Sequence, residues 1–339
     1  MCAAIGRDVA TGDVRSGVPS VSVVVPVYNS RETLAELVAR IDRVLSPRGV
    51  YELILVDDGS SDGSDEEVRR LALAHPHVRG IFLMRNFGQH NALLAGIRVA
   101  RFPVTVTLDD DLQNPPEEMP LLLDRLERGC DVVYGMPGQV RQELWRKMGS
   151  KLVRLALRSA MAGKRAAMVS PFRAFRTELR RAFANYSAPS VAIDVLLTWG
   201  GARFDSVTVS HEERRSGRSG YSFLKLASHA INMMTGYGSW PLRFASIVGF
   251  FFTLVGIGVL AYVLGRYVVA GGSVPGFPFL ASIVALFSGA QLFALGIIGE
   301  YLSKVHVRSM DRPPYVVADV TASGPAHEYA AQQGTGMDR

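Results

Sequence analysis

The stretch VSVVVPVYNS, residues 21–30, decides the fold. Its first seven residues are a continuous apolar run rich in β-branched side chains, which is typical of a strand buried on both faces of a parallel sheet. Polar residues follow this run at once, and residues 31–45 then place apolar side chains at helical spacing. The pattern predicts a buried strand, a polar turn and an amphipathic helix.

The same alternation continues along the chain. It predicts further strands at residues 51–57, 78–85 and 104–111, and a helix at residues 90–100. Strands that alternate with helices indicate an α/β fold with a mostly parallel, doubly wound sheet and flanking helices. Ligands bind such sheets at the carboxyl ends of the strands. Polar clusters fall at four predicted strand ends, at residues 28–30, 57–60, 86–91 and 109–111, and we expect them to converge on one rim of the sheet.

The densest polar cluster is TLDDDLQNPPEE, residues 107–118, where three carboxylates end a predicted buried strand. Like charges this close raise one another's pKa or require a cation. Because side chains alternate along a strand, we expect Asp109 and Asp111 to point the same way and Asp110 to point oppositely. With Gln113 nearby, Asp109 and Asp111 offer oxygen ligands suited to Mg²⁺ or Mn²⁺.

Other interpretations of the acidic stretches explain less. Residues 114–117, Asn-Pro-Pro-Glu, have the pattern of a helix N-terminus, which leaves the three preceding acids unexplained. Residues 57–65 begin like a calcium loop but have Arg69 where a bidentate glutamate is needed. Two interpretations of residues 57–65 therefore stay open. The stretch is either a turn with a helix cap, or it contains a strand-end acid that contacts a nucleotide base. The chain has no Gly-x-Gly-x-x-Gly or Walker loop, which argues against dinucleotide and P-loop chemistry.

Two apolar stretches near the C-terminus are long enough to cross a membrane. Residues 244–265 contain no charge, and residues 277–299 contain Gln291 as their one strongly polar side chain. Each would form a helix roughly 33 Å long, against a hydrocarbon core about 30 Å thick. The short, Gly-rich connector at residues 266–276 predicts a two-helix transmembrane hairpin, and a pair of buried helices in a soluble protein is the alternative.

Basic residues orient this predicted hairpin. Arg243 precedes it, Arg266 alone lies between the two spans, and the basic residues that follow are Lys304, Arg308 and Arg312. By the positive-inside rule both ends of the hairpin face the cytoplasm, and with them both termini and the large N-terminal domain. Residues 1–18 lack the apolar core of a signal peptide. We therefore expect a multi-pass protein of the inner (plasma) membrane.

Composition and charge narrow the function classes. A chain length of 339 residues is typical of a protein with about two domains. With two cysteines, Cys2 and Cys130, a disulfide scaffold and a cysteine zinc site are excluded. The net charge of +6 suits a protein held against anionic lipid, and no nucleic-acid motif accompanies it, so no nucleic acid is expected as a partner. Small residues in the first span favour packing between copies in a homo-oligomer, namely Gly249, Gly256 and Gly258.

Arginines and lysines crowd the region between the acidic cluster and the first span. Arg146 lies in a helical stretch, Arg173 follows it, and a Gly/Ser-rich loop after the predicted strand at residues 204–209 contains Arg214, Arg215 and Arg218. Such side chains are either solvated, in contact with lipid headgroups, or part of a phosphate clamp that closes over a ligand.

Six motifs follow one another along the chain. They are Pro26-x-Tyr28-Asn29, Val56-x-Asp58-Gly59-Ser60, Asn86-x-Gly88, Asp109-Asp110-Asp111-Leu112-Gln113, Ser170-x-Phe172-Arg173 and Arg214-(x)4-Ser219-x-Tyr221. In this order they resemble the family-2 inverting glycosyltransferases of the GT-A fold. With the hairpin, residues 20–317 resemble the polyprenyl-phosphate glycosyltransferases: dolichyl-phosphate mannose synthases, bactoprenol glucosyltransferases and undecaprenyl-phosphate aminoarabinose transferases. NFGQHNALLAGI and TLDDDLQNPPEE are most similar to the last group.

The resemblance implies a role for each matching residue. The base and ribose of a nucleotide-sugar donor would be held by Pro26, Tyr28, Ser30, Val56 and Asp58. The metal that bridges the donor diphosphate would be held by Asp109, Asp111 and Gln113, with Asp110 lining the same turn. Arg214 would neutralise the diphosphate, which makes Asp109, Asp111 and Arg214 the catalytic group. The phosphate of the acceptor lipid would be met by Arg146 and Arg173.

The resemblance also implies a reaction and a domain organisation. The reaction is an inverting transfer of a sugar from a nucleotide-diphosphate sugar, with UDP favoured, to an undecaprenyl-type phosphate at the cytoplasmic membrane face, for cell-envelope glycosylation. The implied segments are a flexible tail at 1–18, a cytoplasmic GT-A domain at 19–220, juxtamembrane amphipathic helices at 221–243, a transmembrane hairpin at 244–299 and a cytoplasmic tail at 300–339.

The sequence departs from the family pattern at Met136, Ala167 and Gly220, where an arginine, an acid and a lysine are usual. Arg215 or Arg218 is our candidate to replace the missing lysine. These departures allow an alternative function, a catalytically weak scaffold that binds nucleotide sugar and lipid. A processive polysaccharide synthase would need a Gln-x-x-Arg-Trp motif and more membrane spans, and the chain has neither.

Overall fold

The computed structural model describes residues 20–138, 169–188, 191–212, 240–270 and 276–321. The chain divides into two compact units, one built around a β-sheet and one that contains two long helices. The described residues after 311, residues 312–321, belong to the sheet unit. The predictions made for residues 1–18 and 221–239 lie outside the described residues.

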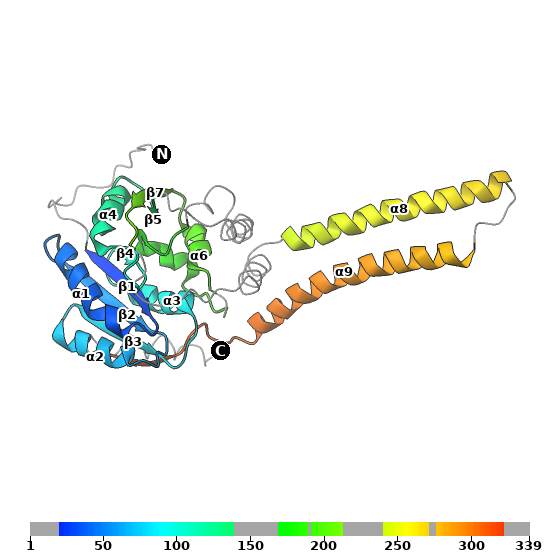
Figure 1. The fold of residues 1–339 in the computed structure, drawn as a ribbon. Coiled ribbons are helices and arrows are strands. Elements are labelled where there is room, and N and C mark those ends of the chain that lie inside the picture. Colours follow the sequence, from blue (N-terminus) through cyan, green and yellow to red (C-terminus); the bar gives the residue numbers. More distant parts are fainter. Residues whose placement is uncertain (1–19, 139–168, 189–190, 213–239, 271–275, 322–339) are drawn as a thin grey trace. The chain divides into compact units, whose positions relative to one another are not determined.

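An eight-stranded mixed sheet forms the centre of the larger unit (Figure 1). Its strand order is β7-β5-β6-β4-β1-β2-β3-β8, with β1 in parallel pairing to both β2 and β4, and β2 to β3. The strands are β1 (Val21–Val27), β2 (Tyr51–Asp57), β3 (Val78–Leu83), β4 (Val104–Thr107), β5 (Val132–Pro137), β6 (Arg173–Arg176), β7 (Phe204–Val209) and β8 (Val317–Val320). The mostly parallel sheet predicted from the sequence is confirmed.

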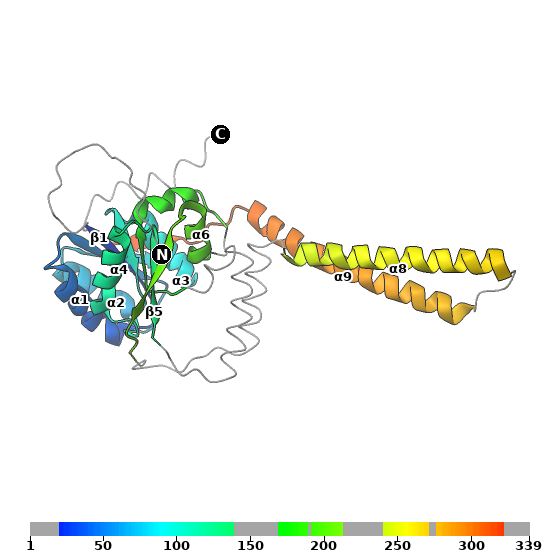
Figure 2. The same ribbon diagram turned by 90° about the horizontal axis from the view of Figure 1, so that it is seen from above.

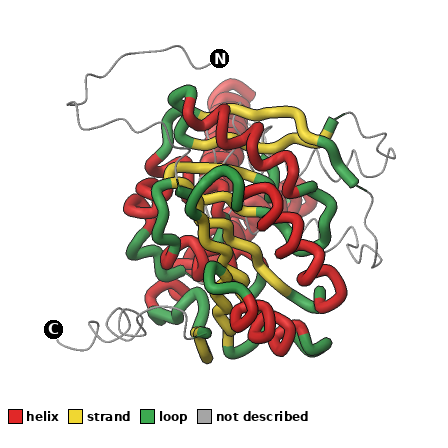
Figure 3. Tube along the Cα trace, turned by 90° about the vertical axis from the view of Figure 1, so that its left-hand side faces the viewer, coloured by secondary structure: helices red, strands yellow, loops and turns green. Residues whose placement is uncertain are grey.

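Helices cover both faces of this sheet (Figures 1 and 3). Alternate residues of β1, such as Val23 and Val25, share a buried core with Leu37 and Ile41 of α1 (Arg31–Leu45). Apolar residues of two more helices line this core, α2 (Ser64–Ala74) and α4 (Met119–Glu127).

The opposite face of the sheet contacts α3 (Gln89–Val99), and α6 (Ile193–Gly200) lies in contact with α3. A Cβ on Gly96 would lie 2.4 Å from Cγ1 of Val24, so α3 can sit this close to β1 only with glycine at that position. The helix α3 therefore packs closely against β1 and β2.

Several segments differ from the sequence prediction. The strands predicted at 78–85 and 104–111 end at Leu83 and Thr107, because the polar residues that follow turn away from the sheet. The antiparallel strand β6 is inserted between β4 and β5, and η3 (Thr177–Phe183) follows it. Short strands such as β6 give no periodic pattern of their own, and the sequence analysis did not predict it.

The predicted cytoplasmic tail contributes a strand. β8 pairs antiparallel with β3, and the Gly80 amide donates to Oγ1 of Thr321 over 2.8 Å. Arg69 of α2 forms a 2.6 Å ion pair with Asp319. Residues 312–321 therefore pack as part of the sheet unit.

The smaller unit contains two long apolar helices that run side by side in both views (Figures 1 and 2). They are α8 (Trp240–Ala270) and α9 (Phe277–Ser309), and the rings of Phe252 and Phe287 lie 5.9 Å apart between them. Spans of membrane-crossing length and apolarity occur at Leu242–Val263 and Leu286–Ser309, with mean hydropathies of 2.3 and 1.2. Two apolar helices thus lie where the hairpin is predicted, with α8 running on through part of the predicted connector, and their insertion in a membrane stays a prediction.

Candidate functional site

The turns that follow β1 and β4 are joined by Asp110. Its carboxylate accepts a hydrogen bond from the Tyr28 amide over 3.1 Å and a second one from the Ser30 hydroxyl. The hydroxyl of Thr33 donates to the backbone carbonyl of Asp110 over 2.7 Å. The middle acid of the triplet thus fixes the relative position of the two loops, which is a structural use of that carboxylate.

Asp58 joins the ends of β2 and β3 in the same way. Its two carboxylate oxygens accept hydrogen bonds from the amides of Phe87 and Gly88, over 2.7 and 2.8 Å. Gly59 has a φ of +69°, and a Cβ there would lie 2.6 Å from the carbonyl carbon of Arg85. Glycine is therefore required where these two loops approach each other. Burial raises the pKa of Asp58.

Asp57 carries a buried oxygen that has no hydrogen-bond partner among the described residues. The side chain is 3% exposed, its Oδ2 accepts from the Ser60 amide over 3.3 Å, and its Oδ1 is the unpaired atom. Burial raises the pKa of this carboxyl group. A buried acceptor left without a donor is costly, so this strand end suits a ligand that brings an N–H or O–H group.

The predicted donor residues lie around these loops. Pro26 and Val56 are opposite each other on β1 and β2, and both are buried. Tyr28 is 50% exposed at the end of β1. The structure thus brings Tyr28, Ser30 and Asp58 to the same edge of the sheet as Asp110.

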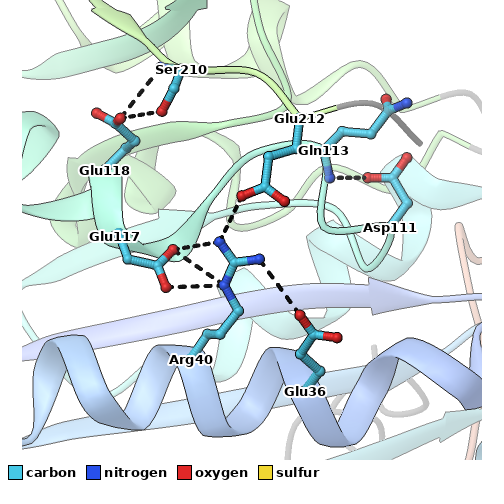
Figure 4. A network of polar contacts seen from close by, with 8 residues as sticks. All are labelled: Glu36, Arg40, Asp111, Gln113, Glu117, Glu118, Ser210 and Glu212. Carbon is cyan, nitrogen blue, oxygen red and sulfur yellow. Dashed lines mark hydrogen bonds and ion pairs between the residues drawn. The ribbon is translucent and has the colours of Figure 1, made fainter. Parts of the chain in front are cut away.

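The acids Asp109, Asp110 and Asp111 lie on a turn beyond β4, not within a strand. The alternation argument for the directions of Asp109 and Asp111 is therefore wrong, since β4 ends at Thr107. Leu112 adopts a φ of +59°, and the Gln113 amide donates to Oδ1 of Asp111 over 3.2 Å (Figure 4).

Asp109 is the most perturbed acid of this turn. Its Oδ1 accepts a hydrogen bond from Nε2 of Gln89, the first residue of α3. Burial, together with the charges of Asp111 and Asp110, raises the pKa of Asp109 to about 7. Carboxylates crowded in this way gain most from a positive partner.

This donor set fits a cation that is completed by a ligand. Within the described parts of the chain, no three His, Cys, Asp or Glu side chains are grouped to hold a metal ion by themselves. Mg²⁺ is usually held by one or two carboxylates together with water and substrate phosphates. Two carboxylates, Asp109 and Asp111, with the amide oxygen of Gln113, match that chemistry.

Arg173 of β6 lies opposite Thr107, the last residue of β4 before the acidic turn, and is 1% exposed. Its Nη1 binds the carboxylate of Asp194 on α6, and its Nε donates to Oγ1 of Thr107 over 3.0 Å. The Tyr134 hydroxyl donates to the same Asp194 oxygen over 3.1 Å. Because Arg173 pairs with Thr107 across β4 and β6, its positive charge acts on Asp109 and lowers the pKa of that acid against the effect of burial. Contact between Arg173 and an acceptor phosphate stays a prediction.

Known proteins share both the sequence and the architecture. Residues 22–184 match the model of glycosyl transferase family 2. The undecaprenyl-phosphate 4-deoxy-4-formamido-L-arabinose transferase of Proteus mirabilis is 38% identical over 305 residues, which cover 88% of this chain and 93% of that protein. The Klebsiella pneumoniae protein of the same name is 35% identical over 308 residues, covering 89% and 94%. The chain belongs to glycosyl transferase family 2.

The family assignment agrees with the fold of this glycosyltransferase. A crystal structure of a mycobacterial protein superposes with a TM-score of 0.51 at 20% identity, covering 65% of this chain and 75% of that one. That similarity concerns the fold alone, a mostly parallel sheet with helices on both faces. The resemblance found from the six motifs is confirmed, and the protein is a glycosyltransferase.

Some predicted residues of the glycosyltransferase lie outside the described residues. They are Arg146, Arg214 and the substitutes Arg215 and Arg218, together with the departures Ala167 and Gly220. The third departure, Met136, lies on β5 and is paired with Thr208 of β7. Roles assigned to these residues stay predictions.

The sequence analysis missed Arg40, which lies beside the acidic turn (Figure 4). Its guanidinium contacts Glu117 at 2.7 Å and Glu212 at 3.0 Å, and Glu36 at 3.8 Å. The local signal in the sequence is the spacing of Glu36 and Arg40 by four residues on one helix, which is common on exposed helix faces. The other two partners are far away in sequence.

Proposed function

We propose that this glycosyltransferase transfers a sugar from a nucleotide-diphosphate sugar to an undecaprenyl-type phosphate, with inversion at the anomeric carbon. The observation that supports this most is the extent of the match to undecaprenyl-phosphate 4-deoxy-4-formamido-L-arabinose transferases. At 88% of the chain, the match is too long to leave out either the sheet unit or the two apolar helices. The first donor to test therefore carries 4-deoxy-4-formamido-L-arabinose.

The donor nucleotide would bind across the ends of β1 and β2. The half-exposed ring of Tyr28 offers a surface on which a base can stack. The unpaired Oδ1 of Asp57 would accept a hydrogen bond from a ring N–H of the base, as uracil provides. Satisfying this buried oxygen would favour a uridine donor over a base that presents only acceptors there.

The donor diphosphate would lie over the acidic turn. Asp109, Asp111 and Gln113 would hold Mg²⁺ or Mn²⁺, and the bound cation supplies positive charge to the departing diphosphate. Asp110 holds the turn in place through its hydrogen bonds with Tyr28 and Ser30. Its carboxylate would therefore position the turn and would not bind the cation. Arg214 would add a second positive charge to the leaving group.

The nucleophile would be an oxygen of the lipid monophosphate. The second pKa of a phosphate monoester is about 6, so the group is largely dianionic at neutral pH and needs no strong general base from the chain. The difficulty is the approach of two anions, which cationic side chains relieve. Arg146 is the predicted residue for this contact, and in-line attack would invert the anomeric configuration.

The helices α8 and α9 would anchor the enzyme in the inner membrane as a two-span hairpin. Large apolar side chains along α8 are exposed, among them Ile247, Phe250 and Leu260. Such side chains are suited to contact with acyl chains. With the basic residues on both flanks of the hairpin, this arrangement would leave the sheet unit and both termini in the cytoplasm.

Radiolabelled sugar transfer to undecaprenyl phosphate tests the proposal. The purified full chain in detergent is given UDP-4-deoxy-4-formamido-L-arabinose, UDP-glucose or GDP-mannose, each with Mn²⁺, with Mg²⁺ or with chelator. We expect organic-extractable product from one donor, dependent on cation. Asp111→Ala should lower the rate at least about 100-fold, since it removes a group that stabilises transition-state charge.

Asp124→Asn is the matched control for Asp111→Ala. This variant removes the Asp124 carboxylate on α4, which pairs with Arg48 at 2.7 Å and is not among the acids of the turn. The rate should therefore stay unchanged. Absence of product from every donor, with cation-dependent nucleotide binding intact, would reject the proposal in favour of the scaffold function.

A further inference from the structure

A helical turn directly after the acidic residues contacts the chain segment that leaves β7. In η1 (Pro116–Glu118), Glu118 accepts hydrogen bonds from the hydroxyl and the amide of Ser210. Its neighbour Glu117 binds Arg40. Two adjacent carboxylates thus reach two different segments, α1 and residues 210–212.

The guanidinium of Arg40, on α1, contacts side chains of both η1 and residues 210–212 (Figure 4). Its Nε donates to Oε1 of Glu117 over 3.0 Å, and its Nη2 contacts Oε2 of Glu117 at 2.7 Å and Oε1 of Glu212 at 3.0 Å. The Arg40 side chain is 12% exposed, while the carboxylates of Glu117 and Glu212 are 44% and 38% exposed. A lysine could not form this set of bonds, because the planar fork of arginine supplies them in fixed directions.

Glu212 connects this cluster to the candidate cation ligands. Its backbone amide donates to the carbonyl of Gln113 over 2.9 Å, and the Gln113 amide in turn donates to Asp111. In Figure 4 the side chains of Asp111 and Gln113 extend away from Arg40, whereas Glu36, Glu117 and Glu212 surround it. The path from Arg40 to the acidic turn therefore runs through Glu212 and the Gln113 backbone.

The charge balance makes Arg40 hard to replace. Three carboxylates share the Arg40 guanidinium, and the charge of Arg43 acts on Glu117 as well, so removal of Arg40 takes away the one cation that ion-pairs with all three among the described residues. Carboxylates gathered around one guanidinium repel one another once that guanidinium is removed. The repulsion would push residue 212 away from the turn and strain the hydrogen bond to Gln113.

We propose that Arg40 is a positioning residue of this glycosyltransferase, which ties Glu117 and Glu212 together so that the turn at Asp111 and Gln113 keeps the geometry that binds cation and donor diphosphate. The role rests on the proposed function, and Arg40 itself touches neither ligand. It acts through Glu212 and Glu117. The carboxylates that pair with Arg40 are 44% and 38% exposed, and ion pairs in contact with solvent contribute little to folding stability, so the expected loss is in ligand binding rather than in the fold.

Hydrogen exchange and Mn²⁺ binding test the proposal on the full chain without turnover. The variants are Arg40→Gln, Arg40→Lys and Glu212→Gln. Arg48→Gln is the matched control, because Arg48 also ties the α1 region to α4, through Asp124, but has no contact with the turn in the described residues. Exchange is followed in peptides 108–118 and 204–212, and Mn²⁺ binding by loss of the free-ion EPR signal.

We expect faster exchange in both peptides for Arg40→Gln, with the rest of the sheet unchanged. Mn²⁺ binding should weaken about tenfold, the equivalent of ~1.4 kcal/mol. Glu212→Gln should give a smaller change in the same direction, Arg40→Lys an intermediate one, and Arg48→Gln none. In transfer assays the same variants should raise the KM for donor and the Mn²⁺ requirement, while kcat at saturation changes less.

Two results would overturn the proposal. Unchanged exchange in both peptides for Arg40→Gln would show that Arg40 does not hold the turn. Faster exchange with unchanged Mn²⁺ affinity would show that it holds the turn without positioning the ligands. If the wild-type chain transfers no sugar, the proposed function fails, while the exchange and Mn²⁺ measurements still decide the role of Arg40.

Discussion

Two arginine networks hold the acidic turn, one beneath it and one beside it. Arg173 is 1% exposed and pairs with one aspartate, Asp194, whose other neighbour is the Tyr134 hydroxyl. Arg40 is 12% exposed and is shared by three glutamates that remain in contact with solvent. Arg173 reaches the last residue of β4, Thr107, and Arg40 reaches the segment that follows β4 through Glu117.

The difference in depth assigns different tasks to the two arginines. A buried ion pair has lost its hydration, so breaking it leaves an uncompensated charge and is strongly destabilising. A pair at the surface can exchange its partner for water, so breaking it changes stability little. We therefore expect the Arg173 network to support the fold and to supply a fixed positive charge below Asp109, and the Arg40 network to set loop geometry.

The largest effect is expected from Arg173→Met. Removal of the guanidinium leaves Asp194 buried without its cation, which should lower the free energy of unfolding by about 3–5 kcal/mol. Urea denaturation of the full chain in detergent measures this. The double variant Arg173→Met/Asp194→Leu should recover most of the loss, because an apolar pair leaves no buried charge. A double variant as unstable as the single one would contradict this account.

A smaller loss is expected from Asp194→Asn. The amide keeps the shape of the side chain and still accepts a hydrogen bond from Arg173, but the buried guanidinium loses its counter-charge, so the expected loss is at the lower end of the range for a broken buried pair, about 3 kcal/mol. The same denaturation measurement applies. Because Arg173 then acts on the turn without its counter-charge, Mn²⁺ binding should also weaken. A stability equal to that of the wild type would mean that this buried ion pair contributes as little to folding as an exposed one.

The Tyr134 hydroxyl tests the edge of the buried network. Tyr134→Phe removes one hydrogen bond to Asp194 and leaves the ion pair with Arg173 intact, so the expected loss is about 1 kcal/mol. The side chain is fully buried, and phenylalanine fills the same space without the hydroxyl. A loss as large as that for Arg173→Met would mean that the hydroxyl, not the ion pair, dominates.

The smallest effect on stability is expected at the surface network. Arg40→Gln should change the free energy of unfolding by no more than about 1 kcal/mol. The hydrogen bond to Arg40 holds the pKa of Glu117 below its ordinary value of 4.5. A lowered carboxyl pKa stabilises the folded state above the unfolded pKa, and this stabilisation is lost as the pH falls through the folded pKa.

The pH dependence of this small effect can be measured directly. The difference in Tm between wild type and Arg40→Gln should be constant near neutral pH and should close on acidification below pH 4.5, as Glu117 becomes protonated. Scanning fluorimetry across that range gives the comparison. A gap that persists after all three carboxylates around Arg40 are protonated would mean that Arg40 acts through packing instead of charge.

Local patterns in the sequence predicted the elements that local forces specify. The bounds of β1, of the helix at residues 31–45 and of β2 agree with the prediction, because burial on both strand faces gives a continuous apolar run and burial on one helix face gives a period of 3.6 residues. The polar strand ends were predicted to meet, and the hydrogen bonds between Asp110 and Tyr28 and between Asp58 and Phe87 show that they do.

Contacts between distant segments could not be predicted in the same way. β6 and β8 are four residues each, too short for a period to be visible. Arg173 matched a motif as a phosphate ligand, but its burial depends on Asp194 from a helix that the sequence analysis did not identify. Arg40 had no motif, since its partners lie 77 and 172 residues away.

The sequence by itself determined the α/β sheet, the two long apolar helices, the family and the acidic cluster, because each depends on residue types in a local order. Only the tertiary structure decided which charged side chains at that turn are used by the protein itself. Hydrogen-bond partners and depth below the surface set that use, and both depend on segments that meet through the sheet topology. Asp110 and Asp58 are engaged in joining loops, and Arg173 and Arg40 hold the turn from two sides.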